Sequence, residues 1–397
     1  MTKTSKTKKN ICVIHPTKFA YSETFIHNHI RYLPANVHAV HGGLMSGEMM
    51  VSMDSGSDQL LVPPFFSRAE KLKNIILKIG KHIDALTSHD SSKKLSPVST
   101  GFLSKYFIKH KIHAVLAEYG PTGSAIMETC QKARVPLIVH FHGYDAHLKD
   151  LTDAYGRLYR KMFGQAAAIV AVSRKMEKQL IKLGAPPEKI YYNVCGIETD
   201  KFKATDPGKN PPHFLAVGRF VEKKAPHLTI LAFKELIDHF PSARLVMVGD
   251  GPLLETCIHL SKALNLSNSI EFTGPLEHDK VAMIMQKSRA FVQHSVTPSS
   301  GDSEGTPVSL LEACASGLPV ISTRHAGIKD IIIENKMGFL VDEFDIQQMT
   351  KHMISLSQKP ELALGLGKNG RAHILNHLTM EKSIDNLWKI ISDQFSG

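Results

Sequence analysis

Two carboxylates, Glu304 and Glu312, lie eight residues apart in the segment GDSEGTPVSLLEACASGLPVISTRHAGIKD, residues 301–330. The first lies in a polar loop, and the second lies in the apolar helical segment that follows. Carboxylates repel phosphate, so we expect both to accept hydrogen bonds from the hydroxyl groups of a sugar. The spacing therefore favours a ligand that is rich in hydroxyl groups.

The start of this helical segment is a predicted anion site. Thr306 is the expected N-cap, and Pro307 is the expected first helical residue, where a missing N–H costs nothing. Gly305 precedes them, and the unpaired N–H groups of a helix start attract phosphate. Gly317 is the expected residue just beyond the helix end. A phosphate flanked by hydroxyl groups is what a nucleotide sugar offers.

A second group of candidate residues follows a predicted strand over residues 213–217. The next loop begins with Gly218 and carries Arg219 and Lys224, five residues apart. Both cations can bind a diphosphate, the guanidinium in a forked geometry and the ammonium as a point charge. Lys223 lies next to Lys224 and competes for the same role. This loop is therefore a predicted diphosphate site.

His142 follows the most apolar predicted strand of the first half, residues 136–141. Ligands of parallel α/β sheets bind beyond the carboxyl ends of strands, so His142 is a candidate for chemistry. Gly143 would let backbone approach a ligand, and Asp145 is a candidate supporting residue. A lone histidine is more often a structural residue, and this alternative stays open.

Together these segments resemble glycosyltransferase family 4. The Glu-x7-Glu spacing is flanked by Gly-Thr-Pro before the helix and by Gly-Leu-Pro-Val-Ile-Ser-Thr after it. The longer run is similar to the branch that includes colanic acid and amylovoran glycosyltransferases. Members of the family are retaining enzymes, and the resemblance implies the α/β fold class called GT-B. Two Rossmann-like domains with parallel sheets then face each other across a cleft.

The resemblance also implies roles for individual residues. Arg219 and Lys224 would bind the donor pyrophosphate. Glu304 would position the transferred sugar, and Glu312 would bind the ribose hydroxyls. His142 would hold the sugar from the opposite domain, so catalysis would require domain closure.

Further site residues follow from the same resemblance. The backbone of Gly274, Pro275 and Leu276 would meet the nucleotide base. Ala225 stands where the family has glycine, which is a mild departure from its pattern. The remaining cleft candidates are Ser22, for which capping of the next helix is an equal alternative, Glu23 and His294.

The order of predicted elements agrees with two α/β domains, because short apolar strands alternate with helical patterns in both halves. Residues 203–212 contain three prolines and form the predicted linker. We predict an N-terminal acceptor domain over residues 1–205 and a nucleotide-sugar domain over 206–379; in the GT-B architecture a last helix, 380–397, crosses back to the N-terminal domain.

Predicted strands cover residues 11–15, 37–41, 60–62, 113–118, 136–141, 167–173, 189–195, 213–217, 244–248, 269–273, 290–293 and 338–341. Predicted helices include residues 22–33, 174–183, 226–238 and one that begins at Ser124, and residues 42–58 are expected to form a polar loop.

The composition predicts a globular protein without a membrane-spanning segment. No run approaches about 20 apolar residues, and the apolar run after the basic N-terminus is too short for a secretion signal. The five cysteines form no Cys-x-x-Cys pair, which argues against disulfides and a structural zinc site. These features favour the cytoplasm.

The net charge of +11 is concentrated in two segments: residues 1–10 carry an excess of four positive charges and residues 65–111 an excess of seven. Within the second segment, residues 65–86 have apolar side chains at helical spacing with lysines between them. A basic amphipathic helix suits an anionic partner, such as the inner membrane surface, a lipid phosphate or nucleic acid. Packing of this helix on its own domain is the alternative.

We therefore predict a retaining enzyme that transfers a hexosyl group from a UDP- or GDP-linked sugar to a saccharide or glycolipid acceptor in cell-surface polysaccharide biosynthesis. No Asp-x-Asp motif occupies a suitable loop, so we expect no bound metal and no cofactor. One alternative is a GT-B-like sugar-nucleotide epimerase. The other is a membrane- or nucleic-acid-binding protein that uses the basic segment; nothing in the chain resembles a nucleic-acid module, so nucleic acid is not an expected partner.

Overall fold

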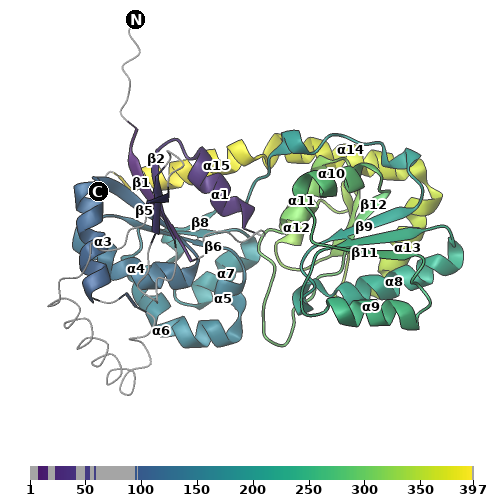
Figure 1. Ribbon diagram of the computed structural model, residues 1–397, viewed down its shortest axis with the longest axis horizontal. Helices are drawn as coiled ribbons and strands as arrows, with labels where there is room; N and C mark the ends of the chain where they lie inside the picture. Colours follow the sequence, from purple (N-terminus) through teal and green to yellow (C-terminus); the bar gives the residue numbers. More distant parts are fainter. Residues whose placement is uncertain are drawn as a thin grey trace, which may run out of the picture.

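The computed structural model describes residues 8–16, 23–41, 50–53, 58–59, 94–95 and 97–395. These residues form two α/β lobes that lie side by side, with the N-terminal lobe on the left in Figure 1. Ser22, the predicted strand over residues 60–62 and the predicted basic helix over residues 65–86 lie outside the described residues. Among the described helices, none combines the length and apolar character that crossing a membrane requires.

The N-terminal lobe contains a sheet of eight strands: β1 (Asn10–His15), β2 (Asn36–His41), β3 (Met50–Met53), β4 (Asp58–Gln59), β5 (Ile112–Glu118), β6 (Leu137–Phe141), β7 (Ala168–Ala171) and β8 (Ile190–Tyr192). Their order is β4-β3-β2-β1-β5-β6-β7-β8. The six strands from β2 across to β8 run parallel, while β3 and β4 extend the β2 edge in antiparallel fashion. The predicted loop over residues 42–58 is therefore wrong in part, because a short strand pair forms there.

Helices flank this sheet: α1 (Thr24–Tyr32), α3 (Pro97–Lys109), α4 (Gly120–Ala133), α5 (Tyr144–His147), α6 (Lys149–Gln165) and α7 (Arg174–Lys182). The helix predicted to begin at Ser124 begins at Gly120 instead, because Pro121 is favourable in a first turn. A glycine is required there, since a Cβ on Gly120 would lie 2.4 Å from the Phe141 ring.

The C-terminal lobe contains six parallel strands: β9 (His213–Val217), β10 (Arg244–Val248), β11 (Ile270–Gly274), β12 (Ala290–Gln293), β13 (Val320–Thr323) and β14 (Gly338–Val341). Their order is β11-β10-β9-β12-β13-β14. The predicted strands of this half are confirmed to within one residue at each end. The helices are α8 (Pro226–His239), α9 (Leu254–Ala263), α10 (His278–Gln286), α11 (Val308–Ala315), α12 (Ile328–Ile331), α13 (Ile346–Gln358) and α14 (Pro360–His377).

Each sheet has one point at which the strand order reverses. This switch point lies between β1 and β5 in the N-terminal lobe and between β9 and β12 in the C-terminal lobe. Ligands of open α/β sheets bind beyond the carboxyl ends of the strands at such a point. Residues at the ends of β5, β9 and β12 are therefore well placed for function.

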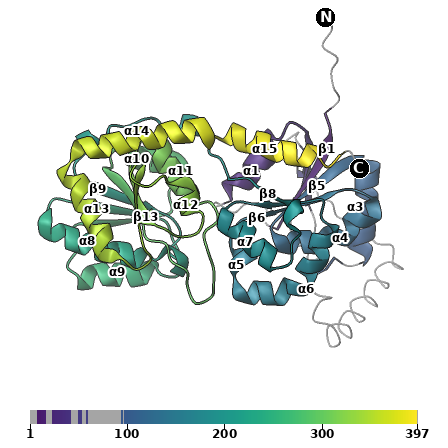
Figure 2. The same cartoon turned by 180° about the vertical axis from the view of Figure 1, so that it is seen from behind.

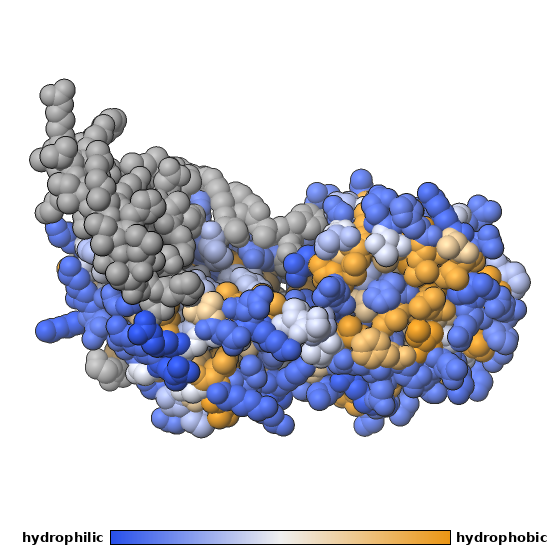
Figure 3. All heavy atoms as spheres, turned by 90° about the horizontal axis from the view of Figure 1, so that it is seen from below, coloured by the Kyte–Doolittle hydropathy of each residue, from blue (hydrophilic) through white to orange (hydrophobic). Residues whose placement is uncertain are grey.

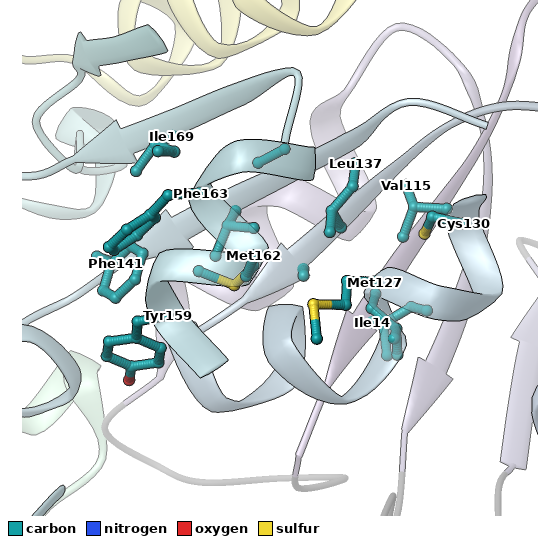
Figure 4. Close-up of a cluster of buried hydrophobic side chains, with 14 of the residues drawn as sticks. Ile14, Val115, Met127, Cys130, Leu137, Phe141, Tyr159, Met162, Phe163 and Ile169 are labelled. Atoms are coloured by element: carbon teal, nitrogen blue, oxygen red, sulfur yellow. The ribbon is translucent and has the colours of Figure 1, made fainter. Parts of the chain in front are cut away.

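A packed aromatic group supports the carboxyl end of β6. Figure 4 shows Phe141 close to Tyr159 and Phe163, and the Phe141 and Tyr159 ring centroids lie 5.6 Å apart. The Tyr159 hydroxyl donates to the carbonyl oxygen of Asp145 at 2.8 Å. This core therefore fixes the strand end from which His142 continues.

The last helix, α15 (Met380–Ser392), returns to the N-terminal lobe. Figures 1 and 2 show α14 and α15 running along one side of both lobes. Ile384 and Leu387 are buried in one cluster with Ile11 and Val13 of β1. Apolar residues at this spacing form one face of a helix, and that face attaches α15 to the N-terminal sheet.

Candidate active site

The central contact of the C-terminal lobe joins two predicted site residues at its switch point. Lys224 follows β9, and its Nζ lies 3.0 Å from Oε1 of Glu304 and 3.3 Å from Oε1 of Gln293, which ends β12. Burial raises the pKa of Glu304, but the charges of Lys224 and Lys223 outweigh this and lower the pKa to about 2. Burial lowers the pKa of Lys224, and Glu304 opposes that shift. The two groups form a buried ion pair.

Lys223 binds a neighbouring part of the same loop. Its Nζ lies 3.0 Å from Oδ1 of Asp302 and 3.3 Å from the carbonyl oxygen of Ser303. Of the two adjacent lysines, Lys224 therefore forms the ion pair with Glu304, and Lys223 forms one with Asp302. Ala225 follows with φ of 38°, in the left-handed region that favours glycine. Alanine therefore carries a strain there that glycine would avoid.

Arg219 lines a pocket together with Lys224, Gln293 and the end of β9. Its side chain is exposed, and its charge acts on Lys224 and on Tyr144 of the other lobe. Gly218 lies against the Lys224 side chain, with its Cβ position 3.5 Å from Cε. Arg219 and Lys224 therefore present two positive charges to one pocket, an arrangement that suits a diphosphate.

Helix α11 begins later than predicted. It starts at Val308, and Pro307 is its N-cap residue, with no side-chain cap among the described residues. The Thr306 hydroxyl instead donates to the carbonyl oxygen of Val172 in the other lobe at 3.0 Å. The predicted capping roles are therefore wrong, because a partner in the other lobe takes this hydroxyl. Gly317 has φ of 82°, as predicted for the residue beyond the helix end.

Glu312 has a different neighbour from Glu304. Its Oε1 lies 3.4 Å from Nδ1 of His278, the first residue of α10. Hydrogen bonding to Glu312 raises the pKa of His278. Residues 274–276 lead into this helix, and Gly274, with φ of 69°, has no described atom within 4 Å of its Cβ position. The predicted ribose residue, Glu312, therefore contacts the start of α10, and the predicted base residues, 274–276, directly precede that helix.

In the N-terminal lobe, His142 lies among aromatic side chains. Its ring stacks on Phe25 with centroids 4.1 Å apart, and its Nε2 lies 2.7 Å from Oε2 of Glu118. Burial lowers the pKa of His142, but Cys195 and Glu118 outweigh this and raise the pKa to about 10. The ring is therefore oriented by its neighbours and positively charged near neutral pH.

Asp145 supports the backbone beside this ring. Its Oδ1 accepts hydrogen bonds from the N–H groups of His142 at 3.0 Å and Gly143 at 2.9 Å, and its Oδ2 accepts one from Gly120 at 3.1 Å. Burial raises the pKa of Asp145, and His142 opposes that shift. Asp145 thus shapes the turn that presents His142.

Glu118, the last residue of β5, is a buried site residue that the sequence predictions missed. Its Oε1 lies 2.7 Å from Nδ1 of His29, while its Oε2 binds His142. Ligand atoms of His29, Glu118 and His140 lie within 4.8 Å of one another, a composition that could hold a metal ion. However, 2.7 Å is shorter than the roughly 3.3 Å between two ligands of tetrahedral zinc, and it fits a hydrogen bond. We therefore interpret the cluster as hydrogen-bonded.

Glycines allow the two lobes to touch at the site. A Cβ on Gly305 would lie 2.0 Å from the carbonyl oxygen of His142, and one on Gly143 would lie 3.2 Å from that of Ser303. Lys175 adds a hydrogen bond from its Nζ to Oγ of Ser303 at 3.2 Å. Backbone approaches this close need glycine, so Gly143 and Gly305 bring His142 next to the Glu304 loop.

The two remaining cleft candidates among the described residues differ in their surroundings. Glu23 accepts a hydrogen bond from the Tyr119 hydroxyl at 2.7 Å. His294 was predicted to face the cleft, and this is wrong: it is fully buried and its Nε2 accepts a hydrogen bond from the Phe344 N–H at 2.8 Å. Burial lowers the pKa of His294 to about 4, so it is a neutral core residue.

His325 is a further residue that the sequence predictions missed. Its Nε2 accepts a hydrogen bond from the backbone N–H of Glu304 at 3.2 Å, and its Nδ1 lies 2.7 Å from Oε1 of Glu343. His325 therefore fixes the backbone of Glu304. It follows the carboxyl end of β13, the kind of position that could have drawn attention to it.

Solved structures share this two-lobe fold. Sucrose-phosphate synthase from Thermosynechococcus elongatus matches with a TM-score of 0.75 at 16% identity, over 98% of this chain and 100% of that one. Anabaena HepE matches with a TM-score of 0.74 at 15% identity, over 97% of this chain and 100% of that one. The fold is the GT-B fold of glycosyltransferases, and the predicted fold class is confirmed.

Sequence comparison supplies the family. The family model Glycosyltransferase Family 4 matches residues 22–201, and the model Glycosyl transferases group 1 matches residues 197–373. AmsK of Erwinia amylovora, an amylovoran biosynthesis glycosyltransferase, is 32% identical over 304 residues, 73% of this chain and 73% of that protein. WcaL of Escherichia coli, named for colanic acid biosynthesis, is 29% identical over 265 residues, 66% of this chain but only 63% of that protein, less than two thirds of its length. The chain belongs to glycosyltransferase family 4.

Proposed function

We propose that this enzyme transfers a hexosyl group from a nucleotide diphosphate sugar to a saccharide or lipid-linked saccharide, with retention of the anomeric configuration. The observation that carries the proposal is the Lys224–Glu304 ion pair beside Arg219 at the C-terminal switch point. Two cations suit a diphosphate leaving group, and a carboxylate beside them suits the hydroxyls of the attached sugar.

Each side chain has a distinct role in this proposal. Arg219 and Lys224 stabilise the negative charge that grows on the departing phosphates. Glu304 remains ionised, because the neighbouring lysines lower its pKa to about 2 against the effect of burial, and it accepts hydroxyl groups of the transferred sugar. Glu312 binds the ribose, and His142 contacts the sugar from the N-terminal lobe. Charge stabilisation comes from side chains, so the proposal includes no metal and no cofactor.

Relatives support the assignment to cell-surface polysaccharide biosynthesis. AmsK is named for amylovoran biosynthesis, and WcaL is named for colanic acid biosynthesis. HepE has been solved with UDP and with UDP-glucose, which supports a nucleotide sugar as the donor. UDP- and GDP-linked sugars are therefore the donors to test.

The test is a thermal-shift screen of UDP- and GDP-linked hexoses, followed by measurement of nucleotide release from each stabilising donor with and without a saccharide acceptor. We expect one donor to raise the Tm and to yield a product that retains the anomeric configuration by NMR. Failure of every nucleotide sugar to stabilise the protein would contradict the proposal. Isomerised sugar released without any acceptor would indicate the epimerase alternative.

We also propose a cytoplasmic enzyme that contacts the inner membrane face through the basic segment, residues 65–111. Its described part includes α3, where Ile108 is 62% exposed and lies between the exposed Lys105 and Lys109. On the face drawn in Figure 3, hydrophobic side chains are exposed on the C-terminal lobe. Contact of the basic segment with an anionic membrane surface would depend on charge. Sedimentation with anionic vesicles at low salt, and its loss at high salt, tests this contact.

A further inference from the structure

Glu118 is a buried charge that the proposed mechanism does not use. It lies at the N-terminal switch point with no exposed surface, and each of its oxygens lies 2.7 Å from a histidine nitrogen, one from His29 and one from His142. Burial raises the pKa of Glu118, but His29 and His142 outweigh this and hold it well below its usual value. A buried carboxylate in this state acts strongly on the histidine that reaches the site.

The His142 ring is held on several sides. Phe25 stacks on it, His140 lies 4.2 Å away between ring centroids, and Tyr119 meets it edge-on at 5.0 Å. Glu118 binds Nε2. The Cys195 sulfur also acts on the ring, but among the described residues no hydrogen bond reaches Nδ1. Nδ1 is itself buried, so the surrounding side chains hold the whole ring in place.

We propose that Glu118 is a positioning residue for the reaction: by accepting the Nε2–H of His142, it fixes the orientation of the ring and holds its positive charge beside the Glu304 loop. The inference rests on the proposed function. A contact between the lobes supports it: the His142 carbonyl lies against Gly305, the residue that follows Glu304. His142 therefore lies beside the Glu304 loop.

The groups that face His142 decide its charge. Glu118 and Asp145 are the acids beside it, and Cys195 adds to their effect. His140 stays neutral, because burial and the charge of His142 lower its pKa well below the usual value. His142 therefore carries the proton and places a positive charge beside the Glu304 loop. Without the Glu118 charge, burial favours a neutral ring, and this positive charge is lost.

The test compares Glu118→Gln with His29→Gln in the full chain. The first variant removes the charge that holds His142, and the second removes the other imidazole bonded to the same carboxylate at the same distance. Nucleotide release from UDP-glucose and from GDP-mannose is measured between about pH 6 and 9, together with the Tm.

We expect Glu118→Gln to lower kcat about 100-fold at the alkaline end, with little change in the donor KM. Its rate should rise as the pH falls, because a His142 with a lower pKa regains its proton only in acid. His29→Gln should keep the wild-type pH profile. A folded Glu118→Gln variant with wild-type kcat and pH profile would overturn the inference.

A second measurement does not depend on turnover. The 15N NMR signals of the wild-type imidazoles should show His142 protonated on both nitrogens at pH 7.5, assigned by their loss in His142→Gln. A neutral His142 at that pH would overturn the inference. If the wild-type enzyme released nucleotide from none of the nucleotide sugars, that result would contradict the proposed function. The NMR measurement would then be the remaining test of the Glu118 inference.

Discussion

The Lys224 ammonium lies 3.0 Å from the Glu304 carboxylate, and the two side chains are 14% and 7% exposed. A pair this buried depends on both partners, because removing one leaves the other charge without compensation. The same loop carries Gly305, which touches His142 in the other lobe. A change at Lys224 can therefore alter stability, donor binding and the contact between the lobes together.

Substitution of one partner should be more harmful to stability than substitution of both. Lys224→Met should lose most turnover and destabilise the protein by about 3–5 kcal/mol, since Glu304 is left buried and unpaired. Lys224→Met combined with Glu304→Gln should recover much of the stability but no turnover. Thermal unfolding and nucleotide release measure the two effects. A double variant as unstable as the single one would show that the pair does not act as a unit.

Arg219→Ala should separate catalysis from stability. The Arg219 side chain is exposed and lines the proposed donor pocket, so its loss should leave the Tm unchanged. Turnover should fall by about 100- to 1,000-fold, because one of two charges on the departing phosphates is removed. Arg160→Ala, at an exposed position of α6, is the control and should keep the wild-type rate. A wild-type rate in Arg219→Ala, measured with the correct donor, would contradict the proposal that Arg219 binds the donor diphosphate.

Acid stability should report the ionisation of Glu304. Its pKa in the folded protein is about 2, below an unfolded value near 4.3, since the lysine charges outweigh burial. The stabilisation is therefore complete above about pH 4.5 and is lost as the pH falls toward 2. Lys224 has a pKa lowered mainly by burial, so its cost is constant in this acid range. The Tm of Glu304→Gln should fall less steeply than that of the wild type below pH 4.5. Parallel decline in both proteins would contradict this assignment.

Local patterns were sufficient for most strands and for the residues at their carboxyl ends. Lys224 and Glu304 were singled out separately, and the fold places them in contact. Glu118 was missed because its partner His29 lies 89 residues away in sequence and on another element. His294 follows a strand end, as His142 does. The orientation of its side chain, however, depends on a contact with Phe344, which is 50 residues away in the sequence and so cannot be inferred from neighbouring residues.

The same limit explains the errors at helix starts. Thr306 has the residue type and position of an N-cap, yet its hydroxyl binds the Val172 carbonyl. That carbonyl belongs to the other lobe, so a prediction from neighbouring residues cannot include it. Interlobe contacts in general require the positions of both sheets, and these depend on the whole chain.

Donor affinity should depend on the ionisation of His278. Hydrogen bonding to Glu312 raises the pKa of His278, so the pair is charged below that pKa and weakens as the pH rises through it. A donor ribose that binds Glu312 competes with His278, and the donor KM should therefore fall as the pH rises. His278→Asn should show a lower KM with little pH dependence. The measurement is the donor KM of both proteins between about pH 6 and 9. A wild-type KM that does not change with pH would contradict the proposed ribose role.

Gly305→Ala should prevent the approach of the two lobes without unfolding either one. An added Cβ would lie 2.0 Å from the His142 carbonyl oxygen and 2.8 Å from the Val172 side chain, both in the N-terminal lobe. The lobes must separate to relieve this overlap. Separation takes His142 away from the proposed donor site, while Arg219 and Lys224 remain in place. Nucleotide binding by calorimetry should therefore persist while transfer falls at least about 100-fold, since misplacement by about 1 Å already has that effect. Gly365→Ala is the matched control, because Gly365 lies in α14 with no described atom within 4 Å of its Cβ position and alanine favours the helix. Normal transfer by Gly305→Ala would show that catalysis does not need this contact between the lobes.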